Sequence, residues 1–481
     1  MNTGIVIHYL AKAMLIGTLL FLIPAAVSLC YGEYFCALIF LLTCAGTAAV
    51  FGLFSLYKPK RQQIRTRESM VIAALLWLIF SVVSALPFYF TGEIPDIWNA
   101  IFESVSGFTT TGATILSDVE CLSHSLSFWR CFSHWIGGMG VLVLAIAILP
   151  SSGDAIYLMR AECPGPSVSK LVPKGKNSAL YLYLIYIGLT LLTFLFLLFG
   201  GMPVFDSICH DMSVAGTGGF SIKNAGIAAY GSAYIEGVLT VAMILFGINF
   251  SLYYFILMRQ FHEVKKNTEI KVYLTIMALA TILMMCNTYS IYQSVGKTFR
   301  AVIFQAASIM TSTGFATEDF VQWPMFSQMI LLCLMFIGGC SGSTGGGFKV
   351  QRVVLLGKSG QLSLRKLVYS NSVNTVKSDG KTLSTDVVHG VMRYLVIYLG
   401  IAVFSVLLLS LKSEDFTATV SSVLSCLSNN GPALGSLGPM ENYSGLFNLS
   451  KMVLCVDMLL GRLECLPLLI LFMPAAWRRD F

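Results

Sequence analysis

The sequence predicts an all-α polytopic membrane protein, and its composition gives the first reason. Of its 481 residues, 56% are hydrophobic and 11% are charged, and the mean hydropathy is +0.77. Soluble globular proteins carry about 25% charged residues. A water-soluble chain of this length could not cover its surface with so few charges, so a soluble enzyme is excluded.

The lengths of the apolar segments give the second reason. A helix that spans a membrane needs about 20 apolar residues, and we expect ten spanning helices, near residues 4–30, 34–57, 70–92, 127–150, 179–200, 234–258, 271–293, 325–356, 388–411 and 446–474. The first of them is long enough to span, so we expect it to be retained and not cleaved as a signal peptide. Four other apolar stretches are too short to cross: 97–109, 204–215, 299–311 and 416–428.

The basic residues set the orientation. The loops on one side of the predicted membrane, together with the C-terminal tail, hold 22 Lys and Arg residues, whereas the opposite loops hold four. By the positive-inside rule, both termini are expected in the cytoplasm and all four short stretches face outward. The net charge of +7 is therefore read as a topology signal, and no nucleic acid is expected as a partner.

The order of long and short segments predicts an internal repeat. After an N-terminal helix pair, the chain repeats four times the unit of a span, a short outward helix, a loop and a second span. The expected units are 1–66 for the helix pair and 67–160, 161–262, 263–358 and 359–481 for the repeats. Non-helical backbone at membrane depth is tolerated only where it lines a cavity or is buried in protein. We therefore expect a pseudo-fourfold central pore.

Each short stretch ends in a turn rich in Gly, Thr, Ser or Asn. A cation that crosses a membrane exchanges its water for oxygen ligands, and rings of backbone carbonyls supply them. Glycine allows the unusual backbone angles, and the helix C-terminus aims partial negative charge at the pore. The glycines expected to align are Gly112, Gly218, Gly314 and Gly431. The expected filter is formed by Thr110, Thr111, Gly112, Gly216, Thr217, Gly218, Ser312, Thr313, Gly314, Asn429, Asn430 and Gly431.

The predicted span 325–356 carries a run in which six of ten residues are glycine. Each glycine costs about 1 kcal/mol against alanine inside a helix, so about 6 kcal/mol opposes a continuous helix and the span should break. A nucleotide-binding loop would need a preceding strand and a Gly-Lys-Ser/Thr ending, which this run lacks. We expect a flexible constriction below the filter, formed by Gly338, Gly339, Gly342, Ser343, Thr344, Gly345, Gly346 and Gly347.

Arg462 lies among apolar residues of the last span, near Asp457 and Glu464. A charge at membrane depth usually faces a cavity or a partner. Two interpretations stay open: a structural ion pair with one of the acids, or a positive charge near the pore axis. The thirteen Cys are scattered without a Cys-x-x-Cys pair and the six His are dispersed, so buried free thiols and no metal-binding cluster are expected.

Several motifs together resemble those of the Trk/Ktr/HKT superfamily of potassium transporters, and within it the bacterial TrkH-type membrane subunit. The matching segments are residues 109–114, 217–221, 311–317, 134–140 and 461–464. The resemblance covers almost the whole chain. One departure is the fourth loop, Asn429-Asn430-Gly431-Pro432, where the family often places a residue between the Asn pair and the Gly.

The resemblance implies potassium uptake across a bacterial cytoplasmic (inner) membrane, with K⁺ at the filter residues and Gly112 favouring K⁺ and Rb⁺ over Na⁺. It implies that residues 338–347 and Arg462 form the gate. It also implies a homodimer controlled by a cytoplasmic RCK-type, TrkA-like subunit, which would bind NAD(H) or ATP, with no cofactor in this chain. The basic loops 150–178 and 357–390 are the expected docking sites.

Two other functions compete with a potassium pore. A proton- or sodium-coupled potassium symporter would need titratable carboxylates near the midplane, and Asp457 and Glu464 are the candidates. A membrane-embedded enzyme would need a catalytic cluster. The only weak sign of one is Ser133 beside His134, and adjacent helical residues point about 100° apart. The chain is therefore predicted not to be an enzyme.

Overall fold

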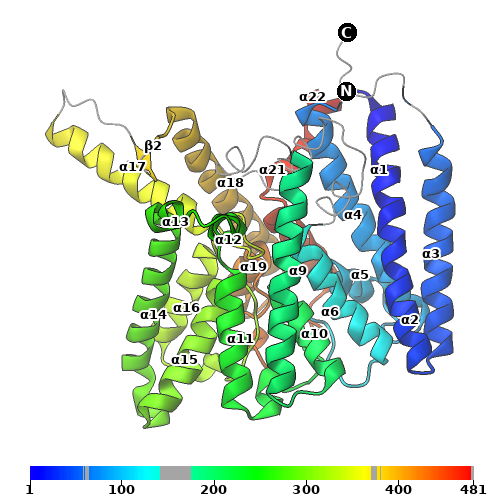
Figure 1. Cartoon of the computed structure of the whole chain (residues 1–481), viewed down its shortest axis with the longest axis horizontal. Coiled ribbons are helices and arrows are strands. Elements are labelled where there is room, and N and C mark those ends of the chain that lie inside the picture. Colours follow the sequence, from blue (N-terminus) through cyan, green and yellow to red (C-terminus); the bar gives the residue numbers. More distant parts are fainter. Residues whose placement is uncertain (58, 60–63, 141–174, 370–375, 380, 478–481) are drawn as a thin grey trace.

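The computed structural model describes the chain except residues 58, 60–63, 141–174, 370–375, 380 and 478–481. The described part is helical apart from one antiparallel hairpin of two-residue strands, β1 (Lys377–Ser378) and β2 (Lys381–Thr382). The first helix, α1 (Thr3–Thr18), begins at the same end of the molecule at which the last helix, α22 (Pro474–Trp477), lies (Figure 1). The all-α prediction is confirmed in this coarse form.

The N-terminal helices form a pair along one edge of the molecule (Figure 1). Its elements are α1 (Thr3–Thr18), α2 (Leu22–Cys30) and α3 (Tyr34–Ser55). A short 3-10 turn joins α1 to α2, so that they make one apolar span. The pair packs against α4 (Thr66–Phe90), where a Cβ on Gly17 would lie 2.6 Å from the Phe80 ring. The small residue allows the two helices to approach closely.

All four short apolar stretches form helices. They are α5 (Ile97–Phe108), α10 (Val204–Ala215), α15 (Val295–Met310) and α19 (Phe416–Ser428). Asp96 and Asp415 cap α5 and α19, because their side chains accept hydrogen bonds from backbone N–H groups of the first turn. Each helix ends in a non-helical loop, as the sequence predicted.

The expected spans are only partly matched. Six helices in the described residues are long and apolar enough to cross a membrane, and a seventh span is formed if the bent pair α11 (Ala233–Phe246) and α12 (Phe250–Leu257), at 90° to each other, is counted as one. The other full-length spans are α9 (Gly175–Phe199), α14 (Thr268–Tyr292) and α18 (Thr385–Ser410). The predicted number of ten is therefore not reached among these residues.

Three predicted spans account for the difference. Helix α6 (His124–Met139) is described only to its end at Gly140. Helix α20 (Asn448–Arg462) has 15 residues and is followed by the short α21 (Leu466–Leu469). The span 325–356 is divided into α16 (Met325–Ile337) and α17 (Val350–Val368). Short α13 (Phe261–Lys266) connects α12 to α14.

The predicted break in the span 325–356 is confirmed, since no helix covers residues 338–349. Gly338, Gly342 and Gly347 have φ angles of +74°, +72° and +81°, in the region that only glycine adopts without strain. After the break, α17 leaves the helix bundle and projects from it (Figure 1).

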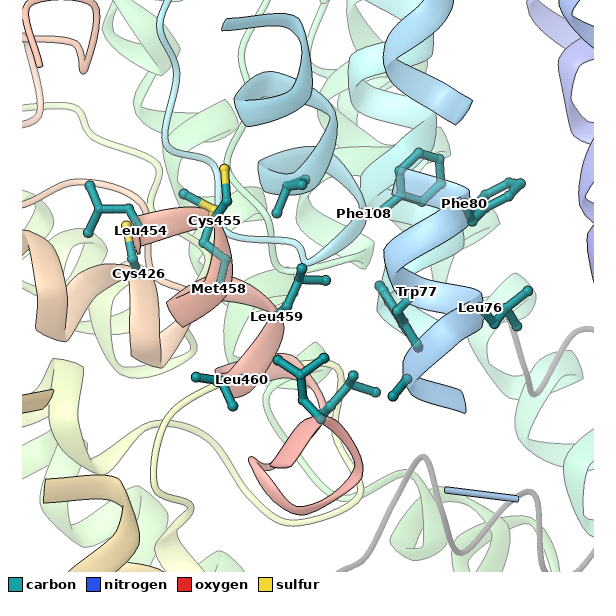
Figure 2. Close-up of a cluster of buried hydrophobic side chains, with 14 of the residues drawn as sticks. Leu76, Trp77, Phe80, Phe108, Cys426, Leu454, Cys455, Met458, Leu459 and Leu460 are labelled. Carbon is teal, nitrogen blue, oxygen red and sulfur yellow. The ribbon is translucent and has the colours of Figure 1, made fainter. Parts of the chain in front are cut away.

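A buried apolar cluster lies between α4 and α20 (Figure 2). Trp77 and Phe80 of α4 and Met458 and Leu459 of α20 are all at most 4% exposed. Phe108, the last residue of α5, packs edge to face on Phe80 with ring centroids 4.8 Å apart. This cluster places the C-terminal end of α20, with Arg462, beside the loop that follows α5.

Candidate functional site

The four loops that follow the short helices share one backbone conformation. One residue just after each helix has a left-handed φ of 54° to 57°. It is the second residue after α5, α10 and α15 (Thr110, Thr217 and Ser312) and the first after α19 (Asn429). Non-glycine residues seldom adopt this conformation, and β-branched threonine least of all. Strained backbone of this kind clusters at functional sites, and here it occurs at the same position four times.

Hydrogen bonds hold this conformation. The N–H of Thr111 donates to the Ser106 carbonyl at 2.9 Å, and the N–H of Asn430 donates to the Ser425 carbonyl at 2.8 Å. Loops two and three have the equivalent bonds. Bonds that reach five residues back, after one left-handed residue, form a Schellman motif. Each helix therefore ends in the same way.

The shared conformation corrects the predicted alignment of the glycines. Two residues after each left-handed residue is a glycine with φ between +78° and +93°; these are Gly112, Gly219, Gly314 and Gly431. Gly219, and not Gly218, is the equivalent in the second loop. The expected triplet Gly216, Thr217 and Gly218 is therefore one residue too early in the chain. The sequence allows this misalignment because Gly218 and Gly219 are adjacent and either could match Gly112.

These four glycines close a ring of loops. A Cβ on each would meet a backbone carbonyl oxygen of the next loop at 2.5 Å or less. In chain order, the glycine and the carbonyl that it faces are Gly112 and Gly218, Gly219 and Thr313, Gly314 and Asn430, and Gly431 and Thr111. The fourth loop faces the first, so the contacts form a cycle. Only glycine permits such an approach, and the four carbonyls occupy equivalent positions.

Within the described residues, the carbonyl oxygens of Thr111, Gly218, Thr313 and Asn430 accept no hydrogen bond. All four residues are buried. Buried carbonyl groups are nearly always paired, so four unpaired ones at equivalent positions are an exception that calls for a ligand. The C-terminal ends of four helices add partial negative charge at the same place. The arrangement suits a dehydrated cation.

A cavity of about 210 Å³ lies against the ring and is lined by all four loops, including Gly112, Gly219, Gly314 and Gly431. Its wall is more polar than apolar, with Thr114, Ser221, Asn224 and Glu441 among the lining residues. Its other lining residues include Lys223 and Met440, which belong to loops that the sequence predicts to face outward.

A buried ion pair, which was not predicted from the sequence, supports the first two loops. Arg130 Nε lies 2.7 Å from Glu103 Oε1, with both side chains at most 1% exposed. Glu103 accepts hydrogen bonds from the Thr114 hydroxyl and the Ile115 N–H at 3.0 Å. Arg130 donates to the Ser221 carbonyl at 3.2 Å. The signal was available, because both charges lie in apolar segments.

His134 lies behind the second loop. Its imidazole stacks on Phe220 with ring centroids 4.2 Å apart and is 0% exposed. A Cβ on Gly218 would overlap this ring. The Ser133 hydroxyl donates to the Arg130 carbonyl at 2.6 Å and not to His134, so the weak Ser/His pair is no catalytic arrangement.

The glycine-rich segment lies against the same ring. The Gly346 N–H donates to Ser312 Oγ, and a Cβ on Gly346 would overlap the Ser428 carbonyl. A Cβ on Gly345 would lie 2.8 Å from the Thr311 carbonyl. The segment therefore packs directly on the third and fourth loops.

The bend between α11 and α12 holds the other side of this segment. Where the helix breaks, the Gly247 carbonyl accepts from the Cys340 N–H at 3.0 Å, and the Phe250 N–H donates to the Gly342 carbonyl at 2.9 Å. Glu269 of α14 accepts from the Ser341 N–H at 2.6 Å. Two broken helices thus satisfy each other's backbone groups inside the bundle.

Arg462 links three elements at the ring. Its guanidinium donates to the Thr344 carbonyl and the Gly138 carbonyl at 2.8 Å each, and to Thr110 Oγ1 at 3.3 Å. It also donates to the Gly137 carbonyl. These partners belong to the glycine-rich segment, the end of α6 and the first loop.

The two acids near Arg462 have other partners in the described part of the chain. Glu464 pairs with Arg352, and Asp457 accepts from the Ser405 hydroxyl at 2.7 Å. The interpretation of Arg462 as half of an ion pair with either acid is therefore wrong. Its place beside the ring agrees with the other interpretation.

Comparisons with known proteins agree with this architecture. The TrkH family, described as cation transport protein, matches residues 38–479. The Trk system potassium uptake protein TrkH of Salmonella typhimurium is 35% identical over 493 residues, which cover 98% of this chain and 100% of the relative. The Trk system potassium uptake protein TrkG of Escherichia coli K12 is 32% identical, with 99% and 100% covered.

A solved structure has the same fold. The crystal structure of the potassium transporter TrkH from Vibrio parahaemolyticus superimposes with a TM-score of 0.89 at 31% sequence identity, covering 99% of this chain and 100% of that one. From the family match over nearly its whole length, the chain belongs to the TrkH family of cation transport proteins, and it is a multi-pass membrane transporter and not an enzyme.

Proposed function

We propose that this chain takes up potassium through a K⁺-selective pore whose filter is the ring of four loops. The observation that carries the proposal is the closed cycle of glycines and unpaired carbonyls at Thr111, Gly218, Thr313 and Asn430. Such a ring replaces the water shell of a monovalent cation without a fixed negative charge. The names of the relatives, Trk system potassium uptake proteins, support K⁺ as the ion.

In this proposal, K⁺ passes from the 210 Å³ outer cavity through the ring and meets the glycine-rich segment as a gate. Gly345 and Gly346 lie against the inner side of the ring, and Arg462 ties Thr344 to the end of α6. Opening requires that the segment leave these contacts. Glycine gives the segment the backbone freedom to do so.

The topology in this proposal has ten spans in a bacterial inner membrane, with both termini in the cytoplasm. The four repeats, 67–160, 161–262, 263–358 and 359–481, then surround the pore with pseudo-fourfold symmetry. The identical ends of α5, α10, α15 and α19 support the repeat. The distribution of Lys and Arg supports the orientation.

A proton- or sodium-coupled symporter is the second candidate. The supporting observation is Asp457, which is 1% exposed and has one carboxylate oxygen, Oδ2, without a hydrogen-bond partner among the described residues. Buried carboxylates at membrane depth mark proton relays. Glu464 is a weaker candidate than the sequence predicted, because Arg352 neutralises it.

We further propose a homodimer that a cytoplasmic RCK-type, TrkA-like subunit controls by binding NAD(H) or ATP. Of the two expected docking loops, 150–178 lies almost wholly outside the described residues. The other, 357–390, includes the C-terminal part of α17, where Leu364 and Leu367 are 67% and 82% exposed next to Arg365 and Lys366. An apolar and basic surface of this kind fits a protein partner.

The test is uptake of ⁸⁶Rb⁺ into proteoliposomes, driven by a K⁺ gradient, with K⁺ or Na⁺ as competitor. The wild-type chain should be blocked by K⁺ and not by Na⁺. In Gly112→Ser, the new Cβ meets the Gly218 carbonyl, and selectivity should fall by about tenfold, which corresponds to about 1.4 kcal/mol.

The matched control is Gly92→Ser. Gly92 has the same φ of +81° as Gly112, but no atom lies within 4 Å of its Cβ position. Equal loss of selectivity in both variants would contradict a filter at Gly112. Uptake that requires a proton or sodium gradient would favour the symporter, and Asp457→Asn would then be the next variant.

A further inference from the structure

Beyond the ring, the first loop is tied to its own helix a second time. Glu103 of α5 accepts a hydrogen bond from the Ile115 N–H at 3.0 Å, and Ile115 is the third residue after Gly112. Each of the other three short helices makes a contact of the same kind, although the side chain that makes it differs in type. The contact is therefore repeated in all four loops.

The side chains that make these contacts occupy matching positions. Three of them lie nine residues before the ring glycine of their own loop and the fourth lies ten residues before it; they are Glu103, His210, Gln305 and Ser421. All four are at most 2% exposed. These four are the supporting residues.

His210 of α10 holds the second loop through both ring nitrogens. Nδ1 lies 2.8 Å from the Asp206 carbonyl oxygen, and Nε2 lies 3.0 Å from Ser221 Oγ. A carbonyl can only accept, and a charged ring would be costly in this buried position, so Nδ1 carries the proton of a neutral ring and Nε2 accepts from the Ser221 hydroxyl. Ser221 Oγ in turn accepts from the Lys223 N–H at 3.0 Å. A chain of hydrogen bonds with one direction therefore fixes the loop after Gly219 to α10.

Gln305 of α15 and Ser421 of α19 hold the third and fourth loops. With its side-chain oxygen toward the loop, Gln305 accepts from the Thr317 and Glu318 N–H groups at 3.0 and 3.2 Å. The orientation of an amide is assigned from such partners. Ser421 Oγ accepts from the Leu434 N–H at 2.9 Å. Thr317 and Leu434 are each the third residue after the glycine of their loop, so the contact matches that of the first loop.

These contacts act on the part of each loop that leaves the ring. The Schellman bonds fix each loop where it leaves its helix, and a supporting residue fixes it two or three residues after the glycine. The ring carbonyl lies between these two fixed points. A site that selects by geometry needs its groups held within about 0.5 Å of the productive position. Satisfying buried polar groups does not by itself require matching positions in four repeats.

We propose that the supporting residues are positioning residues of the filter, which hold the four ring carbonyls at the spacing that favours K⁺ over Na⁺. This inference deepens the proposed function and rests on it. The supporting residues act through the loops and not by touching the ion. Loss of one support lets the carbonyl of its loop shift, so selectivity falls while uptake continues.

His210 gives the sharpest test, because two substitutions differ only in reach. His210→Gln keeps an acceptor that can reach Ser221, as Gln305 reaches its own loop in the third repeat. His210→Asn is one carbon shorter and loses this contact. Ser221→Ala removes the same hydrogen bond from the other side. His262→Asn is the matched control, because His262 is exposed on α13.

The first readout is ⁸⁶Rb⁺ uptake by the full-length variants in proteoliposomes, with K⁺ or Na⁺ as competitor. The ratio of the half-inhibitory concentrations of Na⁺ and K⁺ should fall by about threefold to tenfold in His210→Asn and in Ser221→Ala, the effect of one hydrogen bond. The double variant should fall no further, because both changes remove the same bond. His210→Gln and His262→Asn should keep the wild-type ratio.

The second readout is independent of transport. Hydrogen–deuterium exchange of a peptide covering residues 219–223, measured on the full-length chain in detergent, should be faster in His210→Asn and unchanged in His210→Gln. The reason is that exchange reports local opening of a segment, and the chain of hydrogen bonds through His210 opposes this opening. Unchanged exchange in His210→Asn would overturn the support itself.

Three other outcomes also decide. Faster exchange in His210→Asn with an unchanged ratio would overturn the role in selectivity, and equal losses in His210→Gln and His210→Asn would assign the effect to the packing of the ring and not to its hydrogen bond. If His210→Asn fails to fold, as judged by thermal unfolding, Ser221→Ala decides in its place, since it removes only one oxygen atom. If the wild-type chain shows no K⁺-selective uptake, the proposed function fails, while the exchange measurement still decides whether His210 supports the loop.

Discussion

Glu103→Gln is expected to destabilise the chain strongly, because it breaks the buried pair with Arg130 while it preserves the size of the side chain. The two groups are 2.7 Å apart and at most 1% exposed, so the remaining guanidinium would stay buried and uncompensated. Breaking such a pair costs about 3–5 kcal/mol. The Arg130 side chain would keep its contacts with Ser221 and Phe220 of the second loop and a hydrogen bond of 3.4 Å to the Thr114 hydroxyl.

The assay is thermal and denaturant unfolding of the purified chain in detergent, together with the ⁸⁶Rb⁺ selectivity measurement. Glu236→Gln is the control, since Glu236 pairs with Arg300 at 3.0 Å but Arg300 is 46% exposed. Exposed pairs contribute about 0–1 kcal/mol. Glu103→Gln should also weaken selectivity, because Glu103 holds Thr114 and Ile115 of the first loop.

The reasoning would be refuted if both variants lost the same stability. It would also be refuted if Glu103→Gln unfolded more easily but kept full selectivity, since the pair would then support the fold and not the loops.

Two further predictions concern the gate. In Arg462→Lys, one ammonium replaces a guanidinium that donates to the Thr344 and Gly138 carbonyls. Lysine lacks the fork geometry that holds both carbonyls, so the proposed gate is held less firmly and the initial rate of ⁸⁶Rb⁺ uptake should rise. Arg300→Lys, at the exposed ion pair, should leave this rate unchanged. In Gly346→Ala, the added methyl group meets the Ser428 carbonyl, so the glycine-rich segment should be displaced and the rate of uptake should change. Gly357→Ala is the control, because its Cβ position has open space, and it should leave the rate unchanged. Equal rates in the two variants would show that residues 338–347 do not form the gate.

Several features follow from the sequence alone because they depend on local composition. The length of an apolar segment decides whether it can cross a membrane, so the short helices α5, α10, α15 and α19 were predictable. The glycine content of residues 338–347 opposes a helix wherever that segment lies, so the break was predictable too. The motifs of the first three loops, together with residues 134–140 and 461–464, indicated the family, which the comparisons confirm.

The remaining features depend on contacts between residues far apart in the chain. In the second loop, the sequence permits either of two adjacent glycines to match Gly112; only the carbonyl of Thr313, about a hundred residues away, selects Gly219. Arg462 had two acids close in sequence, yet its partners are carbonyls more than a hundred residues away. The tertiary structure decided these pairings because a buried donor or acceptor takes whichever partner the packing of the helices brings to it, and that packing is not encoded in any one segment.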